Sequence, residues 1–408
     1  MTTGIFNTAG INVTQDLAKK SFAGMITRLM PNGNAPLFGL TAMLPTETAV
    51  QVEHGFFTKT MLFPEMQLDG AIADGTTTVF TVDSTANILP SMIMRVQTTG
   101  EQILVNSILS GTQVSVARGI GTTAAAAIAD NVKLYQVGNA FEESSVRPNA
   151  LQINPVRITN LTQIFRNTWA LSGSAQATQV IAGESPVAEN RQDCAAFHAA
   201  DIEKALFFGE KFSGTRNGQP FRKMDGLTAI LSNLTYYPPS YSAVNVTALG
   251  STTTFTQLQT ALDPVFNQVT DPKGGNDRLF FVGSTMRRVI NEIGRLNGQY
   301  QIMDGQTSYG LQFSQFKLAR GTFRMIEHPL FNSNADWAKY GIAVDLATFR
   351  VAYLNGRKTK KDEFNQNGTA VDNGIDAVGG TLTSELTVVV KNPPANAWLT
   401  NATAAAQG

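Results

Sequence analysis

The residues from Ala49 to Leu68, AVQVEHGFFTKTMLFPEMQL, restrict the possible folds of this chain more than any other segment. Apolar and polar positions partly alternate along them, which predicts a long strand pair or ribbon. A single hairpin is too small to bury that many apolar side chains within itself. The pattern therefore predicts a ribbon that needs a partner.

The low charge of the chain points in the same direction. Charged residues make up 15% of the sequence, against about 25% in typical soluble globular chains. Because charge is depleted from the cores of protein interfaces, this composition favours obligate assembly. The 31 basic and 31 acidic residues give a formal net charge of zero, which argues against the broad cationic surface that binds nucleic acid tightly.

Cysteine and histidine are too few for several common kinds of site. One cysteine excludes an internal disulfide, and three scattered histidines do not form a standard zinc site. There is no apolar run of about 18 residues, and the amino terminus lacks the pattern of a signal peptide. We therefore expect a soluble protein from a reducing compartment, with no metal, cofactor or membrane partner.

The length and texture of the chain predict more than one domain. A chain of 408 residues is too long for one ordinary compact core. From Asp69 to about Gly138, short segments rich in β-branched residues alternate with turn residues, which is typical of a small all-β module. A different texture resumes at FEESSVRPNALQINP. We interpret residues 69–138 as an insertion into the ribbon.

The clearest helix follows this region. Ser185 is a good N-cap, Pro186 fits the first helical position and Gly209 is placed to end the helix. The helix would have about 23 residues and a length of about 35 Å, like a long strut.

After the strut a flexible basic loop is expected at KFSGTRNGQPFRKMDG, and a mixed α/β region should follow it to about Asp345. A helix is predicted over 285–296, and its buried face would consist of Met286, Val289, Ile290 and Ile293. A second helix over 255–269 should kink or break at Pro264. Strands are predicted at RLFFVG, FRMIEH, YGIAVDL, FRVAYL and ELTVVVKN.

The stretch DCAAFHAAD suggests a catalytic site, because Cys194, His198 and Asp201 share one face of the strut helix. A working triad, however, normally takes its members from separate elements around a pocket. The side of an extended helix also lacks the strained turn that activates a nucleophile. A small, closely packed face with His198 as a satisfied polar residue is the favoured interpretation.

Two further motifs resemble ligand sites. Gly119, Gly121 and Ala124 nearly match the dinucleotide-binding pattern, but the segment is too short for a βαβ unit, so a turn in the β module is favoured. The basic cluster Arg357–Lys361 is followed directly by Asp362 and Glu363. A polar face or a contact between subunits is favoured there over nucleic-acid binding.

The order of arm, ribbon, strut helix, α/β region and returning strand resembles the major capsid proteins of tailed bacteriophages, which have the Hong Kong 97-like α+β fold. The subgroup with a β module inserted in the extended loop is the most similar. Five strings carry the resemblance: NPVRITNLTQIFRNTWALSGSAQA, SPVAENRQDCAAFHAADIEKALFFG, MDGL, RLFFVGSTMRRVINEIGRLNGQY and ELTVVVKNPPANAW.

The resemblance implies a domain organisation. Residues 1–48 would form an amino-terminal arm, and residues 49–140 an extended loop that carries the β module 69–138. A peripheral domain would consist of residues 141–223 and 346–408, with the spine helix at 185–208. Residues 224–345 would form an axial domain.

The resemblance also implies a function. Copies of the chain would assemble into the hexamers and pentamers of a head shell around double-stranded DNA, which they would contact weakly and without sequence preference. Portal, scaffolding and decoration proteins would be partners. The protein would be made in the cytoplasm of the bacterial host and reside in the virion.

Some alternatives remain at this point. The chain could be another virion protein of a tail or a decoration, the β module could bind carbohydrate, or Cys194 and His198 could serve a hydrolase. Some capsid proteins of this type crosslink through a lysine of the extended loop. Lys59 is the only lysine in the ribbon, but no acceptor or activating carboxylate is identified, so no catalytic residue is assigned.

Overall fold

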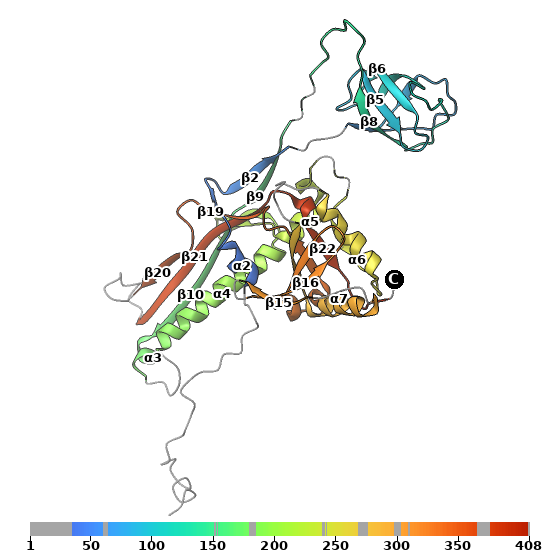
Figure 1. The fold of residues 1–408 in the computed structure, drawn as a ribbon. Coiled ribbons are helices and arrows are strands. Elements are labelled where there is room, and N and C mark those ends of the chain that lie inside the picture. The colour runs from blue at the N-terminus through green and yellow to red at the C-terminus, as the bar shows by residue number, and fades with distance from the viewer. Residues whose placement is uncertain are drawn as a thin grey trace, which may run out of the picture. The chain divides into compact units, whose positions relative to one another are not determined.

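The computed structural model describes residues 35–59, 64–150, 152, 154–178, 185–238, 241, 243–267, 276–297, 303–308, 311–364 and 376–406. The chain divides into two compact units, which Figure 1 shows as ribbons. Residues 57–157 form the body of the smaller unit, and almost all other residues belong to the larger one. Each unit has a hydrophobic core of its own.

The smaller unit is a six-stranded antiparallel barrel with the strand order β3-β8-β5-β6-β7-β4. Its strands are β3 (Glu65–Gln67), β4 (Val79–Thr81), β5 (Met92–Val96), β6 (Gln102–Ser110), β7 (Gln113–Ala117) and β8 (Lys133–Asn139). A bridge between Leu68 and Val82 joins its two edges, so the sheet closes. Because successive side chains of a strand point to opposite faces, alternate residues such as Met92, Met94 and Val96 fill the core.

One layer of the larger unit is a five-stranded sheet with the order β1-β19-β21-β10, in which β20 also pairs with β21. Its strands are β1 (Glu47–Ala49), β10 (Gln163–Ser172), β19 (Phe349–Leu354), β20 (Lys360–Phe364) and β21 (Ala377–Val390). Strands β10 and β21 are antiparallel over ten residue pairs, from Gln163 opposite Leu386 to Ser172 opposite Ala377. The long helix α4 (Pro186–Phe208) packs along β10 (Figure 1).

Helix α4 has the 23 residues predicted from its caps. Its end differs in one respect from the expected glycine cap. Gly209 has a φ of −60° rather than the left-handed conformation. It must be glycine because a Cβ would lie 2.7 Å from the carbonyl oxygens of both Ala205 and Met224. Glycine is therefore required at this position because two backbone segments pack closely there, and not because the residue adopts a left-handed conformation.

The other layer is a seven-stranded mixed sheet with the order β13-β22-β18-β14-β17-β16-β15. Its strands are β13 (Val246–Ala248), β14 (Asp277–Val282), β15 (Met303–Ser308), β16 (Leu311–Lys317), β17 (Thr322–Glu327), β18 (Gly341–Val344) and β22 (Ala397–Thr400). Helix α7 (Ser284–Asn297) buries the predicted face of Met286, Val289, Ile290 and Ile293. Helix α6 (Phe255–Leu262) gives way to a 3-10 turn at Asp263–Phe266, so the break at Pro264 is confirmed; Val269 lies outside the described residues.

The remaining elements are short. They are α2 (Pro36–Thr41), α3 (Gly173–Ala177), α5 (Leu227–Ser232), the hairpin β11 (Phe212–Arg216) and β12 (Gln219–Lys223), and the 3-10 turns Leu234–Tyr236, Phe331–Ser333, Trp337–Lys339 and Pro393–Ala395.

The ribbon has a different partner strand from the one that the sequence suggested. We expected strand pairing within residues 49–68, whereas β2 (Glu53–Thr58) pairs with β9 (Val156–Leu161). The two strands flank the barrel in the sequence. They approach so closely that a Cβ on Gly55 would lie 2.2 Å from the carbonyl oxygen of Ile158. Alternation identifies a strand locally but carries no information about a partner so distant in sequence.

The α+β class predicted from the sequence is confirmed. The described elements also follow the order that the resemblance implies: ribbon, strut helix, α/β layer and a strand that returns to the strut.

Candidate functional site

The three residues of the apparent triad do not form a catalytic site. Cys194 is buried on the face of α4 that packs in the larger unit. Burial raises the pKa of its thiol, so the nucleophilic thiolate is disfavoured. His198 is buried one turn further along and bonds to other residues, and Asp201 pairs with Lys204 at 3.2 Å. The favoured interpretation from the sequence, a packed helix face, matches this geometry.

His198 joins the strut helix to two strands. Its Nδ1 lies 2.7 Å from Oδ1 of Asn167 on β10, and its Nε2 lies 2.8 Å from Oγ of Ser384 on β21. The Nδ2 of Asn167 donates to the carboxylate of Asp201 at 3.0 Å. That bond orients the amide so that its oxygen accepts from Nδ1–H, and Ser384 then donates to Nε2. Both ring nitrogens are therefore occupied, which leaves His198 no free position for general base catalysis.

Replacement of Cys194 tests this conclusion. We expect Cys194→Ser and Cys194→Ala to give the wild-type yield of folded, assembled protein. A serine hydroxyl on a helix can bond to the carbonyl four residues earlier, so the cost should be about 1 kcal/mol or less. Particle yield measured by sedimentation checks the prediction. Complete loss of function in Cys194→Ser with the fold intact would contradict it.

The buried His198 should make stability depend on pH. Burial lowers its pKa, and the charge of Asp201 only partly opposes this. The unfolded chain therefore binds a proton near the ordinary pKa of 6.5, whereas the folded chain does not. Stability should fall as pH drops below that value, by at most about 1.4 kcal/mol per pH unit from this group.

His198→Asn should remove that part of the pH dependence, as measured by unfolding midpoints between pH 7 and pH 5. Cys194→Ala, one turn away on the same helix face, should keep the wild-type dependence. Identical pH profiles for His198→Asn and wild type would show that His198 does not contribute.

The glycine motif of the barrel is a turn, as the sequence favoured. Gly119 has a φ of +62° and follows β7, and no helix follows it. Its backbone N–H donates to the carboxylate of Glu101 at 3.2 Å. The same carboxylate forms a buried bidentate pair with Arg118, at 2.6 and 3.0 Å. An internal carboxylate thus occupies the place that a phosphate would take.

The basic cluster is paired within the chain. Arg357 bonds to the buried Glu385 at 2.6 Å. Lys360 and Lys361 on β20 pair with Asp362 at 2.8 Å and with Glu363 at 2.6 Å. These internal pairs favour the polar face that the sequence analysis preferred.

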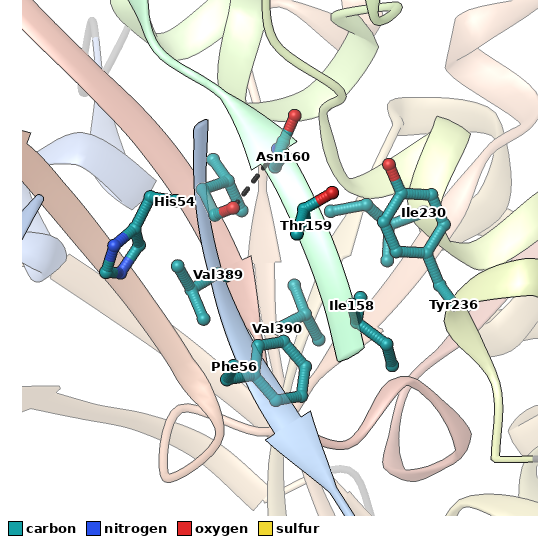
Figure 2. Close-up of a pocket in the computed structure, with 11 residues that line it drawn as sticks. His54, Phe56, Ile158, Thr159, Asn160, Ile230, Tyr236, Val389 and Val390 are labelled. Atoms are coloured by element: carbon teal, nitrogen blue, oxygen red, sulfur yellow. Dashed lines mark hydrogen bonds between the residues drawn. The ribbon is translucent and has the colours of Figure 1, made fainter. Parts of the chain in front are cut away.

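A pocket lies between the ribbon, α5 and β21, and Figure 2 shows its lining residues. Phe56 of β2, Ile158 of β9 and Val390 of β21 point into it, while the amide of Asn160 donates to the carbonyl of Val388 at 3.1 Å. Its free volume of about 10 Å³ holds about one water molecule, whereas ligand sites typically measure about 300–1,000 Å³. The pocket is therefore too small for a substrate or cofactor.

Among the described residues, no group of three or more His, Cys, Asp or Glu side chains could hold a metal ion. Within the same part of the chain, no helix is long and apolar enough to cross a membrane.

A buried polar network fixes the base of the ribbon. Asn160 of β9 donates to the carbonyl of Asp225 at 2.9 Å and accepts from its N–H at 2.9 Å. The carboxylate of Asp225 accepts from the hydroxyl of Tyr236 and from the N–H of Lys211. Burial, together with the bond to Asp225, raises the pKa of Tyr236 and keeps the hydroxyl a donor. The short MDGL string is thus explained by its role in positioning β9.

Exposed apolar side chains gather on the ribbon and on the hairpin β11–β12. Val50 and Phe57 are 83% and 70% exposed, and Val52 and Val156 are also exposed. In the hairpin, Phe212 is exposed beside Phe221. Strands β11 and β12 pair only with each other, and such an isolated hairpin is marginal in water without packing. The alternation within 49–68 indicated the ribbon surface. The sequence predicted a flexible loop over 211–226, however, where the structure has this hairpin.

In the part of the chain that the structure describes, the pocket beside the ribbon is too small for a ligand, and the motifs at Cys194, Gly119 and residues 357–361 are packed or paired within the chain. The same part presents extended apolar surface. These are the properties of a structural protein that works through contacts with other protein chains. Residues 1–403 match the family described as SU10 major capsid protein. The chain belongs to this family of phage major capsid proteins.

The major capsid protein of Pseudomonas phage PaMx41 is 38% identical over an alignment of 408 residues including gaps. The alignment covers 97% of this chain and 95% of the relative. Among solved structures, the capsid of an empty GTA particle is similar with a TM-score of 0.48 and 11% identity, covering 98% of this chain and 100% of that one. A chain of Mycobacterium phage Cain has a TM-score of 0.45 and 7% identity, covering 99% of each chain.

Family membership decides between the alternatives of the sequence analysis. The protein is a structural capsid component and not an enzyme, so the hydrolase alternative based on Cys194 and His198 is wrong. The family consists of major capsid proteins, so the chain is not a tail or decoration protein. Copies of the chain assemble into a multimeric capsid, and the protein resides in the virion.

Proposed function

We propose that copies of this chain assemble into hexamers and pentamers that close into the head shell of a tailed phage around double-stranded DNA. The observation that carries this proposal is the two-stranded ribbon β2–β9, whose apolar side chains remain exposed. Burial of such a surface on a neighbouring copy, repeated around symmetry axes, forms rings that close into a shell. Each obligate contact should bury at least about 2,000 Å².

The proposal assigns the parts of the chain as in a Hong Kong 97-like subunit. Residues 1–48 form the arm, and residues 49–140 form the extended loop with the barrel at 69–138. Residues 141–223 and 346–408 form the peripheral domain around the spine helix, and residues 224–345 form the axial domain. Strand β22 (Ala397–Thr400) comes from the segment assigned to the peripheral domain and pairs with β13 and β18 of the segment assigned to the axial domain.

Weak contact with packaged DNA is consistent with the charge of the chain. The formal net charge is zero, and the basic cluster at residues 357–361 pairs internally. Few phosphates would be neutralised, so binding should be weak and independent of sequence. Portal, scaffolding and decoration proteins are the proposed partners, and synthesis takes place in the cytoplasm of the bacterial host.

Lys59 is exposed at the end of β2, where a crosslink between loops of neighbouring copies would be possible. We assign no crosslink, because neither an acceptor nor an activating carboxylate is identified. Denaturing gels of assembled particles should show a single band at the monomer position. A ladder of covalent oligomers would contradict this expectation.

Negative-stain electron microscopy of the purified protein tests the proposed function. We expect closed shells, or hexameric and pentameric rings under conditions that prevent closure. Tubes or isolated trimers would instead indicate another kind of assembly. A compact monomer at high concentration in every buffer would overturn the proposal.

A further inference from the structure

The buried carboxylate of Glu203 on α4 binds a segment that precedes it by more than 160 residues. Its Oε1 accepts from the backbone N–H of Leu37 at 2.9 Å, and its Oε2 accepts from the N–H of Phe38 at 2.6 Å. The Nε2 of His328 lies 2.6 Å from Oε1. The side chains of Glu203 and His328 are 1% and 0% exposed. The carboxylate is therefore shielded from water and depends on these three donors.

The hydrogen bonds of His328 define the charge balance of this cluster. Its Nδ1 accepts from the N–H of Leu330 at 3.1 Å, so the ring proton is on Nε2 and points at Glu203. In this arrangement the imidazole is a neutral donor. Two of the three donors to the carboxylate consequently come from the backbone of α2. Release of α2 would leave a buried carboxylate with a single neutral partner, which is strongly unfavourable.

The chain that follows α2 makes the docking intramolecular. Residues 42–46 connect α2 to β1, which pairs in parallel with β19 of the same chain from Glu47 opposite Ala352. Five residues span at most about 18 Å. Leu37 and Leu40 are buried in the same core as Phe207 of α4. Residues 36–41 are thus held in three ways: by the short connection to β1, by burial of apolar side chains and by hydrogen bonds to the carboxylate of Glu203.

We propose that Glu203 is the docking site that fixes residues 36–41 to the strut helix, so that Pro36 marks the fixed root of the amino-terminal arm. Residues 36–41 are then a fixed part of the subunit, and not part of an arm that acts as one piece over residues 1–48. The segment 36–41 stays with its own subunit. This inference does not rest on the mode of shell assembly, because all of its contacts lie within one chain.

Native proteolysis of the full chain tests the proposal. Chymotrypsin, which cuts after large apolar residues, should cleave wild-type protein slowly at Phe38 and Leu40. Glu203→Gln replaces an acceptor oxygen by an amide donor that faces a backbone N–H, so cleavage there should be at least tenfold faster. Glu292→Gln, the same change on the exposed side of α7, should keep the wild-type rate. Unchanged cleavage in Glu203→Gln, or equal acceleration in both variants, would overturn the proposal.

Hydrogen exchange separates release of α2 from global unfolding. In the wild-type protein, the amides of Leu37 and Phe38 should exchange as slowly as those of β21. In Glu203→Gln they should exchange at least tenfold faster, with β21 unchanged. Rapid exchange of these amides in the wild type would refute the docking site.

A second pair of variants covers the case in which Glu203→Gln does not fold. Phe38→Ala removes the ring and keeps the N–H donor, whereas Phe38→Pro removes the donor as well. Proline is tolerated in the first turn of a helix, so the helix itself should survive. Cleavage at Leu40 should be at least fivefold faster in Phe38→Pro than in Phe38→Ala. Equal rates would show that the hydrogen bond to Glu203 does not hold the segment.

Discussion

Ile290→Asp or Ile293→Asp should abolish the folded protein and, with it, every particle. Both side chains are 1% exposed on the face of α7 that packs on the seven-stranded sheet. An aspartate there would be a buried charge without a partner, which costs several kcal/mol. A typical domain has a net stability of about 5–15 kcal/mol, so one such change removes most of it. Soluble yield and the cooperative unfolding transition provide the measurement.

Asn291→Asp is the matched control. Asn291 lies between the two isoleucines in the sequence but on the exposed face of α7, so the same charge is placed in water. Surface substitutions of this kind usually change stability by about 0.5 kcal/mol or less. The control should therefore give wild-type yields of protein and of particles. Normal particle yields from Ile290→Asp would show that the assigned buried face of α7 is wrong.

Phe57→Asp should leave the subunit folded and reduce the yield of particles at least about tenfold. Phe57 is 70% exposed on β2 and contributes to no core cluster, so its loss costs the isolated subunit little. The proposed function places the ribbon on a neighbouring copy, and truncation of a buried aromatic anchor costs about 2 kcal/mol or more per contact. Since about 1.4 kcal/mol is a factor of ten and the contact recurs in every copy, assembly should fail.

Two companion variants define what Phe57 contributes. Phe57→Leu keeps an apolar side chain and should assemble almost as well as the wild type. Val50→Asp, at a position 83% exposed ahead of β2, should impair assembly in the same way as Phe57→Asp. Sedimentation and electron microscopy measure the particles, and circular dichroism confirms the fold. Wild-type particle yields from Phe57→Asp would rule out the ribbon as a contact surface.

The properties that depend on neighbours in sequence were predictable. Helix α4 begins and ends where Ser185, Pro186 and Gly209 place it, because caps act on backbone groups within one turn. The buried face of α7 follows from a period of 3.6 residues, and the break after Leu262 follows from Pro264. Strands β15 and β16 were missed, because MDGQTS and LQFSQFK lack a clear apolar alternation.

The candidate site was only partly predictable. The packed face around Cys194 and the turn at Gly119 were favoured over chemistry because each motif lacked the surrounding elements that catalysis or phosphate binding requires. In the structure Cys194 is buried and Gly119 has a φ of +62°. The hydrogen bonds of His198 to Asn167 and Ser384 were not foreseeable. They join residues from three elements that lie far apart in the chain.

The sequence by itself determined the strut helix and the low-charge, apolar ribbon, because these follow from local composition, periodicity and caps. The α+β class followed from the resemblance to the capsid proteins. Only the tertiary structure decided that β2 pairs with β9, that β1 joins β19 in parallel and that Glu203 holds α2. These contacts join segments about 100 to 300 residues apart. Their choice depends on which packing of the whole chain buries the apolar surface while leaving each buried polar group with a partner.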